Sequence, residues 1–274
     1  MNTETNSDAP AVGQQRIVLP VGQVVLGDNC EVMRQWPSES VDLVVTSPPY
    51  DDLRTYGEHE WDFYGVAWNL KRLLKPGGVI VWVVNDATKD GSETGTSMRQ
   101  GLHFQTLGLN LHDTMIYQNP RMPLNGNRYE PEFEFMFVLS KGKPNTWNPI
   151  KVKAVQAGKR QIGTARQKDG TTKARHGQGA VTASTKVKGN VWHINNNPSV
   201  EDKTGHPAPF PIRLAKEHIQ SWSNLGDVVV DPFVGSGTTI KAAKELGRQW
   251  VGIDVNPDYI PIAKARTAQE VLAL

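Results

Sequence analysis

The sequence predicts an α/β protein built on a mostly parallel, doubly wound sheet. Two apolar stretches, VIVWVVND (79–86) and DVVVDPF (227–233), lack the alternation of a half-exposed strand and therefore indicate fully buried strands. Segments with helical patterning separate such strands along the chain. Strands that alternate with helices in this way are typical of a parallel sheet with helices on both faces.

In the first part of the chain, QVVLGD, CEVMRQWP and VDLVVTS within residues 15–45 indicate a strand, a short helix and a second strand. A helix is expected over 61–75, and Pro76-Gly77-Gly78 is expected to end it because neither residue type favours a helix interior. The other elements expected before residue 145 are a strand at 79–86, a helix at 98–108 and strands at 111–117 and 132–140.

Regular patterning stops at about residue 145 and returns at 211. Residues 145–200 are poor in apolar side chains and rich in Gly, Thr, Gln and Lys, so we expect a loop-rich segment or one that becomes ordered on a partner. The elements expected after it are a helix at 211–222, a strand at 227–233, a helix at 238–246, a strand at 250–254 and a helix at 257–270.

The 274 residues, 38% of them hydrophobic, suffice for one large domain with an inserted lobe. No apolar stretch approaches the length of a membrane span, no secretory leader is visible, and residues 1–14 have the composition of a disordered polar tail. The single cysteine, Cys30, excludes an internal disulfide and a cysteine-built zinc site, and no metal is expected. These features predict a cytoplasmic protein.

Charge is unevenly distributed, although the net charge is only +2. Residues 141–190 carry 12 Lys or Arg and one acid, Asp169, whereas the rest of the chain carries 18 basic and 27 acidic residues. An acidic body with a strongly basic insert is typical of nucleic-acid binders, although a solvated lysine-rich loop without a partner has the same composition.

A glycine-rich turn follows the second buried strand and opens a helix, in VVVDPFVGSGTTIKAAKELG. Gly235 and Gly237 allow a tight turn and the close approach of a ligand, and Thr238 and Thr239 can cap the helix whose free N–H groups point at that ligand. Asp254 ends the next strand, 17 residues beyond Gly237, where a carboxylate can bind both hydroxyls of a ribose. The turn, helix, strand and terminal acid together predict a nucleoside site.

Two common phosphate-binding motifs are excluded at this turn. The segment lacks the G-x-x-x-x-G-K-[ST] of a phosphate loop, and Ile240 stands where a dinucleotide-binding G-x-G-x-x-G would have its third glycine. A nucleoside ligand without a pyrophosphate fits better, and S-adenosylmethionine is the candidate cofactor.

TSPPY (46–50) ends an apolar strand with a segment that cannot continue it. Proline lacks an N–H group and has a fixed φ, so this peptide is stiff and its carbonyl groups are available to accept hydrogen bonds. Taken on its own, the segment also fits a strand that simply ends in a proline turn.

Together, DPFVGSGTT, GID, HPAPFP and TSPPY resemble the signature of the amino-methylating DNA methyltransferases, which modify adenine N6 or cytosine N4. The resemblance extends from about residue 23 to 268 and implies a Rossmann-like, S-adenosylmethionine-dependent methyltransferase fold. The order of catalytic peptide, basic segment and cofactor loop resembles the family's β arrangement, a circular permutation of the usual domain. The two loops are then expected to meet at the carboxyl ends of neighbouring strands, at the switch point of the sheet.

The resemblance implies a set of residues around the cofactor. These are Asp28 near the adenine amine, Phe233, Gly235 and Gly237 at the methionine and ribose end, Asp231 nearby, and Asp254 on the ribose. Thr238, at the start of the following helix, is also expected to bind the cofactor. The segment 204–214 (TGHPAPFPIRL) resembles the piece that closes over the methionine moiety.

The resemblance also implies that Ser47, Pro48, Pro49 and Tyr50 form the catalytic peptide. An exocyclic amine is a poor nucleophile because its lone pair is delocalised into the ring, and acceptors aimed at its hydrogens favour a tetrahedral, reactive shape. The Ser47 side-chain oxygen and the Pro48 carbonyl are the candidate acceptors, and Tyr50 is expected to stack on a base flipped out of the duplex. No proline precedes Cys30, so a covalent cytosine-C5 mechanism is not favoured.

The implied organisation is a disordered tail (1–14), a catalytic half (15–144), a basic target-recognition region (145–200) and a cofactor-binding half (201–274). The target-recognition region is expected to bind double-stranded DNA through phosphate contacts from Lys159, Arg160, Arg166, Lys173 and Arg175. The sequence leaves open whether the protein is a monomer or a homodimer and whether a cognate restriction endonuclease accompanies it.

Three alternatives accompany this interpretation. Serine at position 47 is commoner in the family's cytosine-N4 enzymes, whereas adenine enzymes more often carry Asp or Asn, so cytosine N4 is favoured over adenine N6. A protein glutamine methyltransferase uses a similar N-P-P-Y peptide, but Ser47, the permuted order and the basic insert argue against it. Nothing supports a non-catalytic DNA- or cofactor-binding protein, because every expected position is filled.

Overall fold

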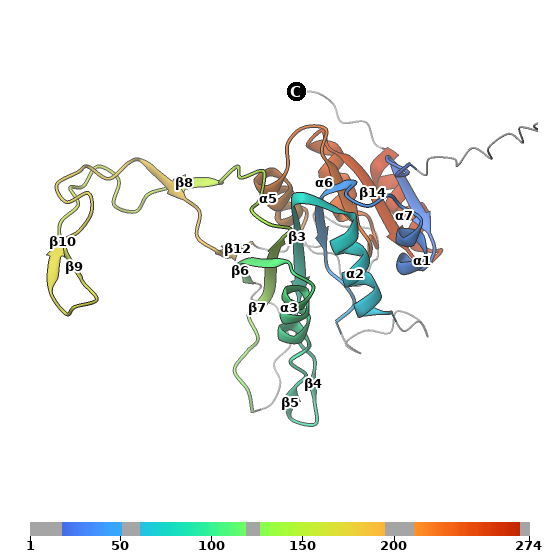
Figure 1. The fold of residues 1–274 in the computed structure, drawn as a ribbon, viewed down its shortest axis with the longest axis horizontal. Coiled ribbons are helices and arrows are strands. Elements are labelled where there is room, and N and C mark those ends of the chain that lie inside the picture. Colours follow the sequence, from blue (N-terminus) through green and yellow to red (C-terminus); the bar gives the residue numbers. More distant parts are fainter. Residues whose placement is uncertain (1–17, 51–60, 119–126, 195–210, 269–274) are drawn as a thin grey trace, which may run out of the picture.

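The computed structural model describes residues 18–50, 61–118, 127–194 and 211–268, and these residues form a central eight-stranded sheet (Figure 1). Its strands, in spatial order, are β1 (Gln23–Leu26), β14 (Gln249–Asp254), β13 (Val228–Asp231), β2 (Val41–Thr46), β3 (Leu74–Val84), β7 (Phe133–Ser140), β6 (Asn110–Gln118) and β12 (Val191–His193). Neighbouring strands are parallel except where β7 pairs with β3 and with β6. The predicted mostly parallel α/β sheet is confirmed.

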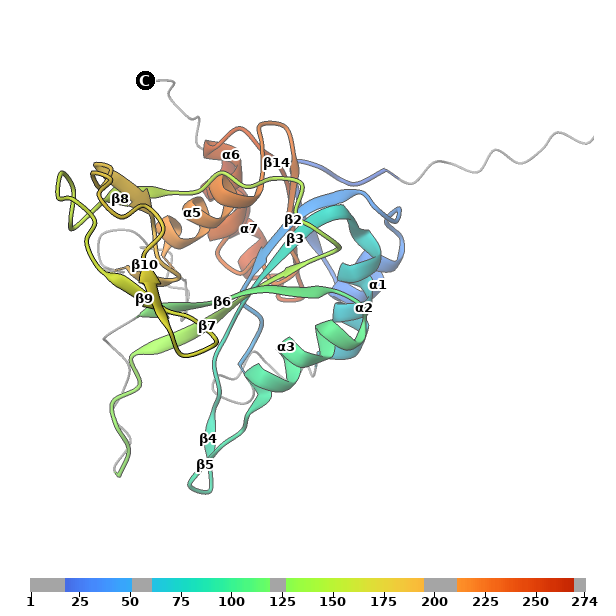
Figure 2. The ribbon, with the colours of Figure 1, turned by 60° about the vertical axis from the view of Figure 1, so that its left-hand side comes forward.

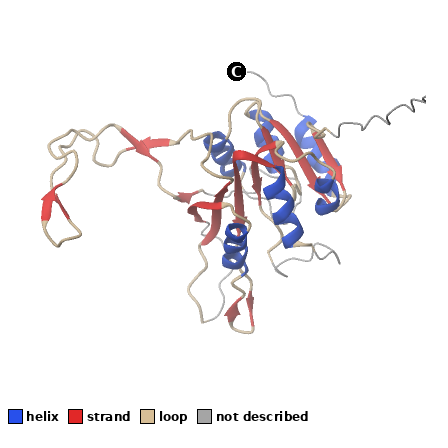
Figure 3. Ribbon diagram, viewed as in Figure 1, coloured by secondary structure: helices blue, strands red, loops and turns tan. Residues whose placement is uncertain are grey.

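Helices cover both faces of this sheet (Figure 3). They are α1 (Asn29–Arg34), α2 (Phe63–Leu73), α3 (Thr96–Thr106), α5 (Ile212–Trp222), α6 (Thr238–Glu245) and α7 (Tyr259–Ala268). Alternate residues of β3 face opposite layers: Ile80 and Trp82 pack with α1, α2 and α3, whereas Val81 packs with α5 and α6. Because both faces are buried, the strand is apolar without alternation, as its sequence indicated.

The boundary predicted at Pro76-Gly77-Gly78 was wrong. α2 ends at Leu73 rather than at residue 75, and Pro76-Gly77-Gly78 lies inside β3 instead of ending the helix. The register between β2 and β3 shifts here, because Val41 pairs with Leu74 while Leu43 pairs with Val79. Gly77 adopts a φ of +77° and donates its N–H to the Lys141 carbonyl at 2.7 Å, so the segment forms an irregularity that the sheet tolerates.

Residues 151–187 form an arm that projects from the body (Figures 1 and 2). Most of its residues lie in turns and loops, as expected from the sequence, but four short strands pair within it. β8 (Lys151–Lys153) pairs with β11 (Thr185–Val187) at its base, and β9 (Thr164–Arg166) pairs with β10 (Thr172–Ala174) near its tip. Between these two strand pairs, backbone hydrogen bonds such as Gln161 N–H to the Ala180 carbonyl, 2.8 Å, link the outgoing and returning segments of the arm. The arm needs no core because its backbone groups pair with each other.

The arm returns to the body through β12, which extends the central sheet beside β6. Trp192 of β12 is buried and stacks on His218 of α5 with ring centroids 4.4 Å apart. Lys188 forms an ion pair with Glu217 and lies over the Trp192 ring at 4.2 Å. The last described part of the region 145–200 therefore belongs to the body, and Lys188 anchors the base of the arm.

β2 and β13 lie side by side, and successive strands are added to the sheet in opposite directions from this point. The chain proceeds from β2 toward β3 on one side, and from β13 toward β14 on the other. The loops that follow β2 and β13 thus leave from the same edge at the switch point, as the sequence predicted. A small hairpin of β4 (Thr88–Lys89) and β5 (Ser92–Glu93) extends from the same edge beyond β3 (Figure 1).

Within the described residues, no helix is both long and apolar enough to cross a bilayer.

Candidate active site

Two side-chain hydrogen bonds join the end of β2 to the end of β13 and to the start of α6, on either side of the two loops. Thr46 Oγ1 donates to Asp231 Oδ1 at 2.7 Å, and Thr239 Oγ1 donates to the Val45 carbonyl at 3.2 Å. Thr46, Asp231 and Thr239 are buried, so these bonds are shielded from water. The TSPPY peptide and the DPFVGSGTT loop therefore form one site, with positions fixed relative to each other. Sequence reasoning did not identify Thr46, whose only signal was its place at the end of the strand.

Asp231 is the most buried carboxyl group of this site. Burial raises the pKa of Asp231 from 3.8 to about 6, although hydrogen bonds from Thr46 and from the Phe233 backbone N–H, 3.1 Å away, act to lower it. The folded protein thus binds this proton more tightly than the unfolded chain does. The contribution of Asp231 to stability is fully present below the unfolded pKa and is lost as the pH rises through about 6.

Asp231→Asn removes this titration while keeping an acceptor oxygen for Thr46. We expect the free energy of unfolding of the wild type, relative to the variant, to fall by about 3 kcal/mol between acid and neutral pH. Urea unfolding at a series of pH values measures this difference. Asp90→Asn, on an exposed turn, is the matched control for replacing a carboxyl group by an amide. Parallel stability curves for wild type and Asp231→Asn would contradict the prediction.

Asp254 holds the glycine-rich loop in place. Its Oδ2 accepts from the Gly235 N–H at 2.8 Å and its Oδ1 accepts from the Asn256 N–H at 2.9 Å. Burial raises the pKa of Asp254, and these backbone hydrogen bonds oppose the rise. A carboxylate has about four acceptor sites, so two backbone bonds leave capacity for ligand hydroxyl groups.

Glycine is required at position 237 for two reasons. Its φ is +89°, and a Cβ atom there would lie 3.0 Å from the Ala263 Cα of α7. Gly237 is also the N-cap of α6, with no side-chain capping bond, so the expectation that Thr238 and Thr239 cap this helix was wrong. Thr238 accepts instead from Arg266 of α7 at 3.2 Å, a contact that the sequence did not indicate.

The Gly27-Asp28 pair lies beside the glycine-rich loop, where β1 ends next to β14. The Gly27 N–H donates to the Asp254 carbonyl at 2.9 Å, and Asp28 is the N-cap of α1 through its bond to the Glu31 N–H. Asn29 donates to the Pro232 carbonyl at 3.2 Å, which links α1 to the DPF turn. Its own side-chain oxygen is buried without a donor among the described residues. A buried acceptor of this kind suits a ligand that carries an N–H or O–H donor.

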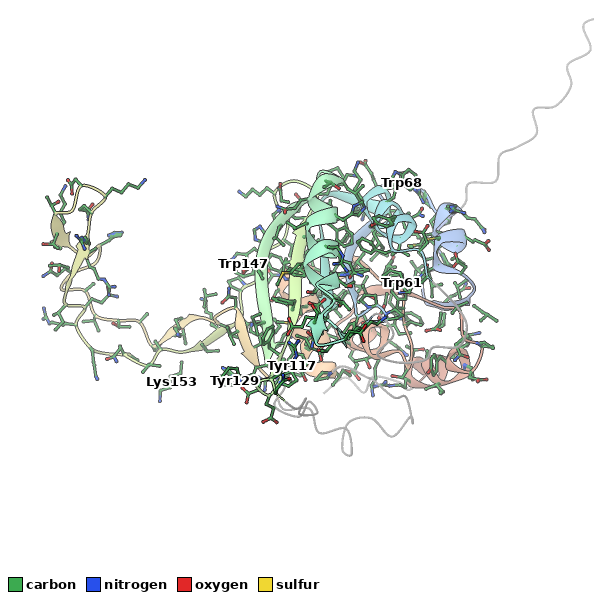
Figure 4. The ribbon with its side chains drawn as sticks, turned by 90° about the horizontal axis from the view of Figure 1, so that it is seen from below. Trp61, Trp68, Tyr117, Tyr129, Trp147 and Lys153 are labelled. Atoms are coloured by element: carbon green, nitrogen blue, oxygen red, sulfur yellow. The ribbon has the colours of Figure 1, made fainter. Side chains whose placement is uncertain are left out.

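Phe233 belongs to an aromatic cluster behind the glycine-rich loop. Its ring meets Trp61 edge-on at 4.9 Å and lies 6.4 Å from Trp82. Trp61 precedes α2, on the body and well apart from Lys153 at the base of the arm (Figure 4). The sequence placed Trp61 at the start of the helix expected over 61–75 and assigned it no role in the site, whereas α2 begins at Phe63.

The hydroxyl group of Tyr50 lies between two polar partners. Tyr50 Oη is 2.7 Å from Ser47 Oγ and donates to Glu134 Oε2 at 2.8 Å. Pro48 is buried, while Ser47, Pro49 and Tyr50 are partly buried. Sequence reasoning assigned no role to Glu134, whose only signal was an acidic residue within the apolar strand EFEFMF.

A thiol nucleophile is absent from the TSPPY peptide, and Cys30 does not fit that role. Its side chain is buried, and burial together with Asp28 and Asp62 raises the pKa of Cys30 to about 11. The thiolate, which is the nucleophilic form, is therefore disfavoured at neutral pH.

The residues present fit S-adenosylmethionine. Gly235 and Gly237 place no side chain at two positions of the loop, Asp254 retains acceptor capacity, and Asn29 offers a buried acceptor. The start of α6 adds N–H groups to the same loop. Most of segment 204–214 lies outside the described residues, as do residues 51–60 and the tail 1–14.

The five basic residues expected to contact DNA all lie on the arm with exposed side chains: Lys159, Arg160, Arg166, Lys173 and Arg175. None of them forms an ion pair within the part of the chain that the structure describes. The single acid of the arm, Asp169, accepts from the Thr171 N–H at 2.9 Å and from the Thr171 hydroxyl at 2.7 Å, so it shapes the turn at the tip. The arm therefore presents its positive charge to solvent.

Comparison with known proteins gives consistent matches. A family model described as DNA methylase (N6_N4_Mtase) matches residues 41–265. The orphan methyltransferase M.BamHII of Bacillus amyloliquefaciens is 46% identical over 241 residues, which cover 85% of this chain and 91% of the relative. The type II methyltransferase M.BglII of Bacillus subtilis is 28% identical over 254 residues, covering 89% and 68%.

Solved structures agree. TTHA0409 of Thermus thermophilus, solved in complex with S-adenosyl-L-methionine, superposes with a TM-score of 0.61 at 26% identity, covering 92% of this chain and 95% of that one. The cytosine-N4-specific PvuII DNA methyltransferase has the same fold, with a TM-score of 0.65 at 21% identity over 94% and 89% of the two chains.

Proposed function

The chain belongs to the N6/N4 family of DNA methylases, and from this premise we propose that it methylates the N4 amine of cytosine at specific sites in double-stranded DNA. That it is an S-adenosylmethionine-dependent DNA methyltransferase acting on an exocyclic amine follows from the family. The observation that carries the choice of base is Ser47, whose hydroxyl lies at the head of the catalytic peptide, 2.7 Å from Tyr50 Oη. Adenine N6 is the alternative, since both amines pose nearly the same chemical problem.

The catalytic peptide acts on the target amine. Ser47 Oγ and the Pro48 carbonyl accept hydrogen bonds from its two hydrogens, which favours a tetrahedral nitrogen and stabilises positive charge as it develops there. The proline residues keep these acceptors rigid, so little reorganisation is needed during the reaction. Tyr50 stacks on the flipped base, and its anchored hydroxyl limits rotation of the ring.

The cofactor loop holds the methyl donor against this peptide. S-adenosylmethionine supplies the electrophilic methyl group when bound. Asp254 binds the ribose hydroxyls, Phe233 and the two glycines line the methionine end, and Asp28 lies toward the adenine. The Thr46–Asp231 bond, 2.7 Å, keeps the two loops in register, so the reacting groups are held in line.

The arm suits a DNA groove. A two-stranded β ribbon fits the major groove of B-DNA, which is about 12 Å wide. In Figure 1 the tip of the arm turns in the direction in which β3 runs toward β4 and β5, the side on which the parallel strands end. A duplex that lies across this side meets both the arm and the catalytic peptide. The exposed Lys and Arg residues then contact phosphate groups and position the target base.

The product identifies the base. We expect DNA incubated with the enzyme and labelled S-adenosylmethionine, digested to nucleosides and examined by mass spectrometry, to contain N4-methylcytosine. Tyr50→Ala is the negative control and should transfer less than about one hundredth as much label, since it removes the stacking ring. N6-methyladenine as the product would favour the alternative base, and 5-methylcytosine would exclude the amine mechanism.

A further inference from the structure

Three oxygen-bearing side chains, Ser47, Tyr50 and Glu134, form a hydrogen-bonded chain at the catalytic peptide. Ser47 Oγ lies 2.7 Å from Tyr50 Oη, and Tyr50 Oη donates to Glu134 Oε2 at 2.8 Å. Glu134 comes from β7, whereas the other two residues follow β2, 84 positions earlier in the case of Tyr50. The link therefore exists only in the folded protein.

The direction of the hydrogen bonds follows from counting protons. A carboxylate can only accept, and a tyrosine hydroxyl carries a single proton, which is used in the bond to Glu134. The bond between Ser47 and Tyr50 must then be donated by Ser47. Since its own proton points to Tyr50, Ser47 Oγ keeps both lone pairs as acceptors for another group.

The fold explains why β7 supplies this carboxylate. β7 runs antiparallel to β3, with Phe135 opposite Val84, so its first residues lie at the edge where the parallel strands end. Phe135 packs against the core on the α2 and α3 face, and stacks on Phe137 at 5.3 Å. Side chains alternate along a strand, so Glu134 leaves the opposite face from Phe135.

We propose that Glu134 is a positioning residue for methyl transfer, acting through Tyr50 to hold Ser47 as a hydrogen-bond acceptor for the target amine. A serine hydroxyl rotates freely and can donate as well as accept. A Ser47 hydroxyl that donated would point its hydrogen at the hydrogens of the amine. Glu134 prevents this because, as an acceptor, it fixes the donor-to-acceptor direction of both hydrogen bonds, from Ser47 to Tyr50 and from Tyr50 to Glu134. The proposal deepens the proposed function and rests on it.

Glu134→Gln tests the proposal, because an amide can donate to Tyr50 and reverse the chain. With tritiated S-adenosylmethionine and DNA, we expect kcat to fall by about tenfold to a hundredfold. Outright loss of one preorganised hydrogen-bonding group costs about a hundredfold to a thousandfold, whereas here Ser47 stays in place and only the direction of its hydroxyl changes. The affinity for S-adenosylmethionine, measured by calorimetry, should stay within about twofold, as should KM for DNA. Glu134→Asp, which keeps the charge, should retain more activity than Glu134→Gln.

Tyr50→Phe is the second test variant, because it removes the hydroxyl group and keeps the ring. It should lower kcat about as much as Glu134→Gln does. The kcat of the double variant should be no lower than that of either single variant, because each substitution already breaks the same hydrogen-bonded link. Glu132→Gln, two residues away at the same edge, is the matched control and should leave kcat within about twofold.

Thermal unfolding of the free proteins gives a readout that does not depend on catalysis. The shifts in Tm for Glu134→Gln and Tyr50→Phe should be non-additive, because the two groups interact directly. Additive Tm shifts, multiplicative losses of kcat, or a Glu134→Gln variant with unchanged kcat would overturn the proposal. A wild-type enzyme that transfers no label to DNA would instead overturn the proposed function. The comparison of Tm among the single and double variants would still decide whether Ser47, Tyr50 and Glu134 are linked by hydrogen bonds. Were Glu134→Gln not to fold, Tyr50→Phe with unchanged kcat would suffice to reject the inference.

Discussion

A protein variant in which five exposed basic residues of the arm are replaced by glutamine is expected to bind DNA about a thousandfold more weakly than the wild type at 0.1 M salt. The replaced residues are Lys159, Arg160, Arg166, Lys173 and Arg175. Each phosphate contact contributes about 0.9 to the slope of log K against log salt, so the slope should become shallower by about 4.5 units if all five contact phosphates. Titration of labelled DNA by fluorescence anisotropy at several salt concentrations measures both quantities.

The arm should remain folded in this variant, because its strands pair through backbone hydrogen bonds and Asp169 shapes the tip. Circular dichroism and Tm are therefore expected to match the wild type. Arg34→Gln with Lys264→Gln, exposed on α1 and α7 away from the arm (Figure 1), is the control and should leave the slope unchanged. An unchanged slope in the five-residue variant would show that DNA binds elsewhere.

Asp254→Ala is expected to lower the affinity for S-adenosylmethionine by about a hundredfold or more. The substitution removes the proposed ribose acceptor and also the partner of the Gly235 and Asn256 N–H groups. Loss of a charged hydrogen-bond acceptor costs about 1.5–3 kcal/mol, and here a ligand contact and the shape of the loop are lost together. Isothermal titration calorimetry with S-adenosylmethionine measures the change.

Asp258→Ala is the matched control, because this carboxylate is exposed four residues further along. It should leave cofactor affinity within about twofold. Asp254→Asn should lie between the two, because one oxygen still accepts from a backbone N–H. Wild-type affinity in Asp254→Ala would mean that the cofactor ribose is held by other residues.

The sequence predicted the elements of the sheet because buried strands and amphipathic helices leave local patterns. The prediction failed where local signals conflicted with the sheet. Pro76-Gly77-Gly78 is a typical end of a helix, yet β3 incorporates it through a shift in register. The pairing of the short strands in the arm also escaped prediction, since strands that pair only through their backbone need no apolar pattern.

The candidate site divides in the same way. Ser47 through Tyr50, Gly235, Gly237 and Asp254 were predicted because proline, glycine and a terminal acid are strong local signals. Thr46, Trp61 and Arg266 were not, because a threonine, a tryptophan or an arginine has no local property that assigns it a partner far along the chain.

The sequence by itself determined the class of fold, the two loops and the uneven charge, since these depend on residue types and their spacing. Only the tertiary structure decided which groups meet. It placed the two loops on neighbouring strands, joined Thr46 to Asp231, and brought Glu134 from the antiparallel strand to Tyr50. Hydrogen bonds between residues 84 or 185 positions apart depend on strand order and register, which no local pattern encodes.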